Sequence, residues 1–525
     1  MKKNIVFNNI NEKILIIFLI TFSFIINQYY GNLGVFPVDS FSHFDTGYKI
    51  LLGDNPFKDY WIVSGPLLDY LQACFFYLFG VNWQSYLLHA SIFNAILTLS
   101  TFLILKDFKL NIYHCFFYSI LFSILAYPSS GTPFVDHHSA FFGLLSIYSL
   151  MLAIKYEKKV YWYILPFLLA CSFFSKQVPS AYIILSVILV LIFYSVTQRK
   201  YIWIKYFLIS SFVILLSLLI FGKFQGISFS SFLEQYILYP QTIRVERLEN
   251  FNLTVERFIF HFKFIHIALI LLFYLNIKIV LLKKNYLKKN DFCNFLILVF
   301  FTFSLILHQL LTKNQTFIFF LIPVLLGFSS INLKKFKFKF NNIMQILLII
   351  LCLLITVKYH VRFNEGRKFH ELVNVNKNLF IRGQEIDSKF KGLKWITPEY
   401  KDNPDEEVAL INEAKLYLSK DSRKKMLVTN YSFFSVILEE NLHSPSRWHL
   451  SDGTDYPLRG NKYFMSYKNL IINLIKKNEI LVIYSIKPLD NSTISTYLDT
   501  NCFAERKIST ILSSYELKNC EEIND

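Results

Sequence analysis

The chain of 525 residues predicts a mainly α-helical, polytopic membrane protein of about eleven transmembrane helices, followed by a small C-terminal α/β domain. Three observations lead to this fold class. Hydrophobic residues make up 54% of the chain and charged residues 17%, whereas charged residues usually reach about a quarter of a soluble domain. The apolar residues form long runs with short polar connections between them. From about residue 360 onward, polar and charged residues become as frequent as in soluble proteins.

The composition also excludes several classes of protein. The net charge is +17, but the basic residues stand in short clusters between apolar runs and not along one amphipathic face. This distribution favours membrane lipids as partners and argues against nucleic acid. The seven cysteines form no CxxC pair and no metal-ligand spacing with histidines. A zinc finger or an iron–sulfur protein is therefore not expected.

The candidate transmembrane segments fill the first two thirds of the chain. A bilayer core of about 30 Å needs roughly 20 apolar helical residues. Eleven segments approach that length, and some of them are short: 13–30, 84–105, 111–128, 138–154, 160–175, 178–197, 201–221, 258–282, 292–310, 317–333 and 342–359. The first follows Lys2, Lys3 and Lys13 in the manner of a signal peptide, but it lacks a small-residue cleavage site. It is interpreted as a retained helix.

Every second connection between these segments is strongly basic. These connections contain Lys106 and Lys109; Lys155, Lys158 and Lys159; Arg199 and Lys200; Lys283, Lys284, Lys288 and Lys289; and Lys334, Lys335, Lys337 and Lys339. The positive-inside bias predicts that they are cytoplasmic, so the N-terminus lies inside. With an odd number of spans, residues 1–359 form a membrane domain and residues 360–525 an extracytoplasmic domain.

The first outer connection, residues 31–83, is long and acidic. It contains five aspartates against only Lys49 and Lys58: Asp39, Asp45, Asp54, Asp59 and Asp69. Apolar residues recur at helical spacing from Phe41 to Leu52 and from Leu67 to Leu78. Both stretches are too short to span a bilayer comfortably, so they predict two helices that lie along the interface.

The tail has the alternation of a small α/β domain. Met426–Thr429 and Glu479–Tyr484 predict strands, and residues 405–419, 431–440 and 467–477 predict helices. Ser444–Trp448 and Asp452–Asp455 are interpreted as loops. Cys502 and Cys520 can pair in an oxidising exterior or stay as two free thiols, and the sequence leaves both states open.

Ionisable residues at the outer ends of spans are functional candidates, because a charge is costly to hold in a membrane. Asp39 follows the first span, where a partly desolvated carboxylate can accept a proton from a hydroxyl or cap the next helix. Asp136 opens the fourth span and is a second candidate cap. His137 and His138 lie about 100° apart on that helix. Either can join Asp136 at a metal ion, but the two cannot easily bind one ion together.

Outer cations form a further group of candidates. Lys176 with Gln177, and separately Lys313, interrupt apolar spans at outer junctions, and Arg244, Arg247 and Arg257 lie in an outer connection. A lysine can bind phosphate as a point charge and an arginine can bind it bidentately. The alternative is that these side chains snorkel to lipid headgroups. Their number favours a substrate with a phosphate at the headgroup plane and a tail in lipid.

The first outer connection also resembles a known family. Asp39-Ser-Phe-Ser-His-Phe-Asp-Thr-Gly-Tyr-Lys-Ile-Leu-Leu-Gly-Asp-Asn-Pro-Phe-Lys-Asp59 and Ser64-Gly-Pro-Leu-Leu-Asp-Tyr70 are similar to the start of GT-C glycosyltransferases, which include the protein O-mannosyltransferase and lipid A aminoarabinose transferase groups. Gly53–Asp59 matches the family's Gly-x-x-Pro-[Tyr/Phe]-x-Asp turn. Ser175-Lys-Gln177 resembles the family's Thr-Lys-Gln step after the fifth span. Ser40 stands where many members carry a second acidic residue.

The resemblance implies a glycosyltransferase that moves a sugar from a polyprenyl-phosphate donor to a lipid, glycan or protein acceptor at the outer face of a bacterial-type inner membrane. Asp39 would be the catalytic base, and Asp136 would position the acceptor or a possible divalent cation. Asp45 would compensate for Ser40. The predicted substrate-binding residues are Asp45, His137, His138, Lys176, Gln177, Arg244, Arg247 and Lys313. The alternative function is a transporter or flippase of a lipid-linked saccharide.

Overall fold

A computed structural model of the chain describes residues 10–243, 253–282, 290–312, 318–336, 340–450, 452–486, 492–518 and 520. The chain divides into two compact units. The first unit comprises Met1–Gly31, Ala90–Leu216 and Phe251–Phe369, and the second comprises Asn32–His89, Ser217–Asn250 and His370–Asp525. The sequence prediction gives residues 360–525 a domain of their own, whereas the structure groups the tail with the first outer connection and with residues 217–250.

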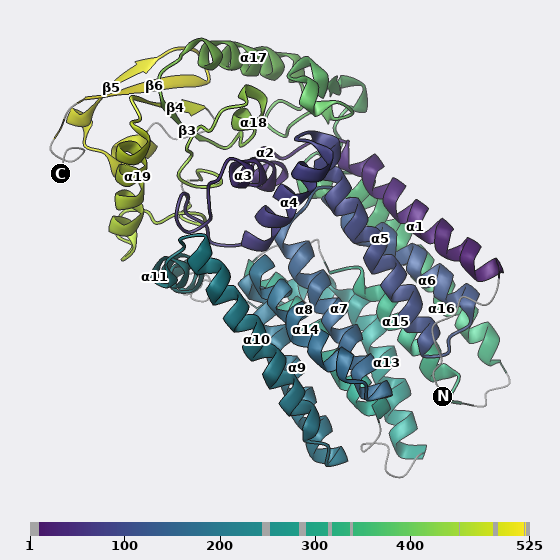
Figure 1. Ribbon diagram of the computed structural model, residues 1–525. Coiled ribbons are helices and arrows are strands. Elements are labelled where there is room, and N and C mark those ends of the chain that lie inside the picture. Colours follow the sequence, from purple (N-terminus) through teal and green to yellow (C-terminus); the bar gives the residue numbers. More distant parts are fainter. Residues whose placement is uncertain are drawn as a thin grey trace. The chain divides into compact units, whose positions relative to one another are not determined.

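Long apolar helices dominate the chain (Figure 1). They are α1 (Ile10–Gly31), α5 (Trp83–Asp107), α6 (Ile112–Leu125), α7 (Val135–Tyr156), α8 (Lys159–Ser175), α9 (Gln177–Gln198), α10 (Ile202–Phe224), α13 (Lys263–Leu282), α14 (Asn290–Thr312), α15 (Leu321–Leu333) and α16 (Asn341–Tyr359). Among the described residues, nine helices are long and apolar enough to cross a membrane, and α8 and α15 are shorter. The mainly helical, membrane type of the chain is confirmed, and the count of eleven spans stays a prediction.

The basic connections of the first unit lie at the same end of its helices. Three ion pairs join different connections to one another or to a helix end: Lys155 with Asp107, Lys200 with Glu157, and Lys335 with Asp291. Lys334 also donates to the backbone oxygen of Lys109 at 3.1 Å. The alternation of charge in the sequence therefore predicts correctly that these basic connections lie at one end of the helices. Residues 283–289 and 337–339, with their predicted lysines, lie outside the described residues.

Helix α7 occupies the interior of the first unit, where it contacts α8, α9 and α14. Gly143 allows this close packing, because a Cβ atom there would lie 2.6 Å from Ile183 Cδ1 and 3.2 Å from Phe301 Cε2. Small residues at such positions let membrane helices approach each other closely. The N-terminal turn of α7, which carries Asp136, is therefore held against α9 and α14.

The second unit contains a four-stranded sheet with the order β3-β4-β6-β5. β3 (Lys425–Thr429) pairs in parallel with β4 (Val482–Ile486), and β6 (Leu512–Leu517) pairs antiparallel with both β4 and β5 (Phe503–Lys507). A short antiparallel pair joins β1 (Ile381–Arg382) to β2 (Lys394–Trp395). Its helices are α2 (Pro37–Ser40), α3 (Ser42–Leu51), α4 (Pro66–Phe79), α11 (Phe229–Phe232), α17 (Pro404–Lys420), α18 (Phe434–Leu438), α19 (Phe464–Asn478) and α20 (Ser492–Tyr497).

The two helices predicted along the interface form as α3 and α4, but the apolar face of α3 is buried and part of that of α4 is exposed. Phe41 and Phe44 are fully buried and pack against Phe390, with ring centroids 5.6 and 5.8 Å away. The aromatic face of α3 therefore packs inside the second unit and is not exposed to lipid. The end of α4 does expose apolar side chains, with Tyr77 80% and Leu78 62% exposed.

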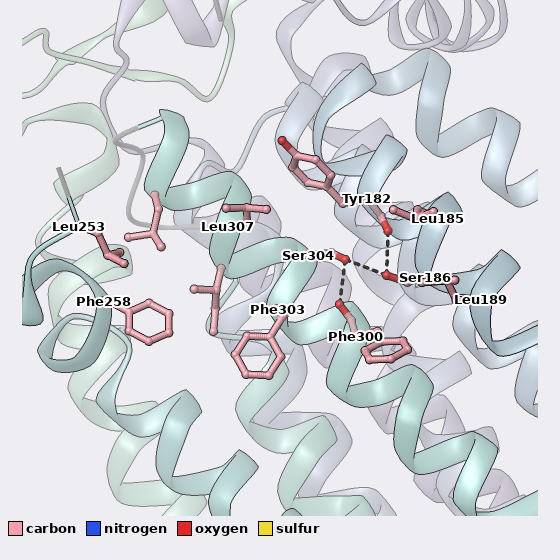
Figure 2. Close-up of a pocket in the computed structure, with 12 residues that line it drawn as sticks. Tyr182, Leu185, Ser186, Leu189, Leu253, Phe258, Phe300, Phe303, Ser304 and Leu307 are labelled. Carbon is pink, nitrogen blue, oxygen red and sulfur yellow. Dashed lines mark hydrogen bonds between the residues drawn. The ribbon is translucent and has the colours of Figure 1, made fainter. Parts of the chain in front are cut away.

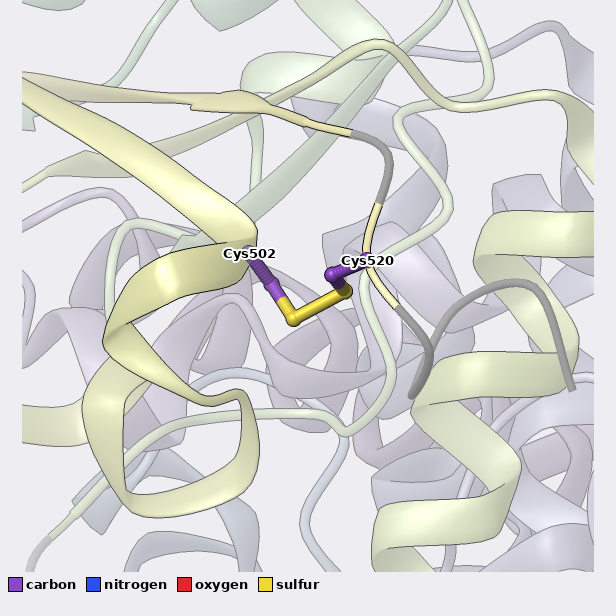
Figure 3. The surroundings of a disulfide bond; sticks show 2 residues. All are labelled: Cys502 and Cys520. Atoms are coloured by element: carbon purple, nitrogen blue, oxygen red, sulfur yellow. A yellow bond between two sulfur atoms is a disulfide. The ribbon is translucent and has the colours of Figure 1, made fainter.

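Cys502 and Cys520 form a disulfide bond, shown in Figure 3. The two cysteines are 18 residues apart, and Cys502 also accepts a hydrogen bond through its backbone oxygen from the backbone N–H of Lys518 at 2.8 Å. This decides the question that the sequence left open. Closing a loop of this size stabilises a fold by about 3 kcal/mol.

Candidate functional site

Asp136 is the centre of a buried ionic cluster in the first unit. Its side chain is 3% exposed, and each carboxylate oxygen accepts one charge-assisted bond. Oδ2 lies 2.7 Å from the Lys176 ammonium, and Oδ1 lies 2.6 Å from Nε2 of His308. The three side chains come from the first turn of α7, the junction of α8 with α9, and the last turns of α14. The predicted candidates Asp136 and Lys176 are thus brought together.

Lys176 makes hydrogen bonds through its backbone oxygen and through its ammonium group. Its backbone is extended between α8 and α9, and its carbonyl oxygen accepts bonds from Ser180 Oγ at 2.7 Å and Ser139 Oγ at 3.3 Å. The side chain reaches the buried carboxylate yet stays 23% exposed. A lysine that merely snorkels to headgroups has no need of a buried partner. Lys176 is therefore a positioned cation with access to the surface.

Neither of the predicted aspartate caps exists. Helix α7 has Phe134 at its N-cap, and Asp136 is already in its first turn. Asp39 lies within α2, and the N-caps of α2 and α3 are Phe36 and Phe41, with no side-chain cap bond at either. Both helices start earlier than the sequence suggests, in α2 because Pro37 can occupy the first helical position. Asp39 is half-buried and is not the N-cap residue of either helix.

His137 and His138 point into a tight turn, η1 (Tyr127–Ser129), that precedes α7. The ring of His137 stacks on that of Tyr127 with centroids 4.8 Å apart, and its Nε2 lies 3.2 Å from the backbone oxygen of Ala126. Nδ1 of His138 bonds to the hydroxyl of Tyr127. Both histidines are fully buried. Their contacts hold the turn in place, and their predicted binding of substrate stays a prediction.

No metal centre is evident in the part of the chain that the structure describes, where no group of three or more His, Cys, Asp or Glu residues is arranged to hold an ion. Asp136 and His308 make only a pair, with Lys176 as the third member. The possible divalent cation stays a prediction.

The remaining predicted binding residues differ in their surroundings. Asp45 is buried and pairs with Lys49 at 3.2 Å, one turn along α3, so its charge is already neutralised. Gln177 is half-buried at the first position of α9. Arg244, Arg247 and Lys313 lie outside the described residues.

An apolar groove of about 500 Å³ runs between α9 and α14 (Figure 2). Its lining comes from the half of each helix that leads to the ionic cluster. It is formed by Tyr182, Leu185, Ser186 and Leu189 of α9, by Phe300, Phe303, Ser304, Ile306, Leu307 and Leu310 of α14, and by Leu253 and Phe258. The hydroxyls of Ser186 and Ser304 lie 3.1 Å apart and join the two helices. His308 follows the lining residue Leu307 in α14, but its own side chain is buried and does not line the groove.

A second buried polar centre lies in the second unit, around Asp69 in the first turn of α4. Its carboxylate accepts four bonds: from His43 at 2.7 Å, Thr46 at 2.6 Å, Tyr60 at 3.1 Å and Arg447 at 2.9 Å. Burial alone would raise the pKa of Asp69, but Arg447 and His43 outweigh it and hold the pKa below its usual value.

Burial first, and then the charge of Arg447, lower the pKa of His43 to about 4, so its imidazole is neutral at pH 7. With four donors, Asp69 has no lone pair left for a substrate. The centre therefore joins α3 and α4 to the segment 444–448 as a structural element. The segment is a loop, as the sequence predicts, and nothing in the sequence indicates that Arg447 within it is buried.

His308 and the groove are the features that the sequence analysis missed. A signal for His308 exists, since it is the one histidine in the apolar run 292–310 and stands near its outer end, where the rule used for the other candidates applies. The groove has no such signal, because every membrane helix has apolar faces. No protein-family model matches this chain, and a search of curated proteins finds no match to it.

Proposed function

We propose that this protein is a GT-C-type glycosyltransferase that moves a sugar from a polyprenyl-phosphate donor to an acceptor hydroxyl. One observation carries the proposal: Lys176, positioned by Asp136, directly precedes α9, and the first half of that helix lines an apolar groove. A cation with surface access, at the start of a helix that lines an apolar groove, suits a ligand with an anionic headgroup and a long apolar tail.

The groove and the cation would divide the recognition of the donor. Lipid tails surround the protein in any case, so filling the groove with a prenyl chain gains little from the hydrophobic effect itself. Discrimination would come from the fit of the first part of the tail between Phe258 and Phe303 and from the phosphate. Lys176 would bind the phosphate as a point charge.

The proposed reaction is an inverting displacement at the anomeric carbon of the donor sugar. The acceptor oxygen forms a bond to that carbon while the bond to the phosphate oxygen breaks, and the electron pair leaves with the polyprenyl phosphate. Asp39, half-buried in α2 of the second unit, would accept the proton of the acceptor hydroxyl as general base, as the resemblance implies. Lys176 would stabilise the charge that develops on the departing phosphate.

Two findings support a site on the outer side of a bacterial-type inner membrane. The disulfide between Cys502 and Cys520 belongs to the second unit, and disulfides persist in oxidising compartments. The described basic connections of the first unit gather at one helix end, as the positive-inside bias requires of a cytoplasmic end. The cluster around Asp136 lies at the helix ends where α7 and α9 begin.

The direct test is turnover of a polyprenyl-phosphate sugar by the purified full-length chain, with a membrane extract as the source of acceptors. We expect release of polyprenyl phosphate that depends on the acceptor. Asp39→Asn should lower the rate by about 10²-fold or more, since a general base contributes that much, while donor binding is retained. Asp402→Asn, at an exposed position of the tail, is the matched control. A transporter would move the donor without releasing polyprenyl phosphate, and that result would contradict the proposal.

A further inference from the structure

Asp136 has two donors, and they differ in their access to the surface. His308 is 2% exposed and Lys176 is 23% exposed. The two use different carboxylate oxygens, so one bond can break while the other stays. Only Lys176 can therefore exchange Asp136 for a ligand that arrives from outside the cluster.

Such an exchange has an electrostatic difficulty. A carboxylate that is 3% exposed loses an ion-pair partner when the lysine turns to a phosphate. Removing one partner from a buried pair is strongly destabilising, because an uncompensated charge stays behind. Lys176 on its own would therefore be held by Asp136 and would be a poor receptor for an anion.

We propose that His308 is a positioning residue that frees Lys176 to bind the phosphate of the donor. Its Nε2–H donates to Oδ1 of Asp136 and keeps the carboxylate satisfied while the lysine is engaged elsewhere. The backbone of Lys176 is fixed by Ser139 and Ser180, so the exchange needs only rotation of the lysine side chain. This role of His308 rests on the proposed function, because it presupposes that Lys176 receives a lipid phosphate.

A plain structural role for His308 makes a different prediction. If the histidine only ties α14 to α7, its loss harms the fold whatever residue stands at position 136. If it compensates the charge of Asp136, its loss matters only while position 136 carries a carboxylate. The dependence on Asp136 therefore separates the two roles.

The test measures binding of a polyprenyl phosphate to the full-length protein in detergent, with the polyprenol of the same chain length as the reference. The ratio of the two affinities reports the phosphate contact alone. His308→Leu should reduce this ratio about tenfold, the scale of one hydrogen bond to a charged group. His308→Gln, whose Nε2 can replace the imidazole donor, should stay within about twofold of the wild type. His114→Leu, near the basic end of the unit, is the matched control.

The decisive comparison is made in the Asp136→Asn background. There, His308→Leu should change the ratio by less than about twofold. A loss of equal size with and without the carboxylate would overturn the proposal in favour of a structural role, as would an unchanged ratio for His308→Leu alone. If Lys176→Ala leaves the ratio of the wild type unchanged, the donor site itself is wrong. If Lys176→Ala lowers the ratio and His308→Leu leaves it unchanged, only the role of the histidine is overturned.

Discussion

At the scale of single residues, the cluster around Asp136 shows which candidates a sequence can reveal. Asp136 and Lys176 were conspicuous because each is a charge at the edge of an apolar run. The sequence does not reveal the pairing of Asp136 with His308, since that histidine lies 172 residues from Asp136 in the chain. The aspartate caps were wrong because both helices begin before the aspartates, a difference of a few residues that spacing alone does not resolve.

The first prediction at this scale concerns Lys176. We expect Lys176→Ala to weaken binding of a polyprenyl phosphate about tenfold or more, since a charged hydrogen bond is lost. Lys176→Arg should keep part of the affinity because it keeps the charge. The measurement is a titration of the purified protein with the lipid. Lys205→Ala, an exposed lysine of α10, is the control, and an equal loss in that variant would show that general membrane charge is responsible.

The second prediction at this scale is a dependence of stability on pH that comes from Asp455. Burial raises the pKa of Asp455 to about 7, although the charge of Arg447 opposes the shift. The unfolded chain therefore releases this proton first as the pH rises. The contribution of Asp455 to stability should fall between about pH 4 and about pH 7 and stay level above that range.

Asp455→Asn should remove this slope, because a neutral side chain occupies the buried position at every pH. The check is the midpoint of thermal unfolding in detergent, followed across that range for the wild type, Asp455→Asn and the exposed control Asp402→Asn. A slope that persists unchanged in Asp455→Asn would assign the pH dependence to other groups.

At the scale of elements, periodicity and length predict where helices form, but not which partner covers the apolar face of a helix. The tail helices α17 and α19 form close to their predicted ranges, and β3 begins one residue early. The second predicted strand starts at Val482 and not at Glu479, because α19 continues to Asn478. β5 and β6 were missed, since their charged outer residues hide the alternation. The spacing predicts that the apolar face of α3 meets the membrane interface, because spacing alone does not show which partner covers a helix face.

The prediction at this scale concerns the packing of α7. Gly143→Leu places a side chain against Ile183 and Phe301 and should destabilise the first unit by about 1–3 kcal/mol, the usual range for overpacking. It should also weaken donor binding, since α7 carries Asp136. The control is Gly222→Leu in α10, where a Cβ atom would meet only the backbone oxygen of Ile227 at 4.0 Å. A variant at position 143 that unfolds at the same temperature as the wild type would show that the close approach is not required.

At the scale of the whole molecule, composition was enough to predict a membrane protein with a mixed tail. It was not enough to predict the second unit, which draws residues 32–89 and 217–250 together with the tail. Such long-range grouping depends on contacts between segments far apart in the chain, and no local pattern encodes them. The Asp69–Arg447 bond, across 378 residues, is an example.

The disulfide supplies a prediction about the topology of the whole chain. Cys502 and Cys520 should resist alkylation in intact cells and react with a membrane-impermeant maleimide after treatment with an impermeant reductant. The described cysteines of the first unit, such as the buried Cys293, serve as internal controls. Labelling that requires permeabilised membranes would place the second unit on the cytoplasmic side.

The most direct test of the central claim is photo-crosslinking with a polyprenyl phosphate that carries a photoreactive group near the phosphate end of its tail. Mass spectrometry of the crosslinked wild-type protein should locate the label on the α9 and α14 residues of the groove, such as Leu185 and Phe303. The yield should fall in Lys176→Ala and when unlabelled lipid competes. Labels that fall instead on the lipid-exposed face of α10, and that ignore both the variant and the competitor, would contradict the proposed donor site.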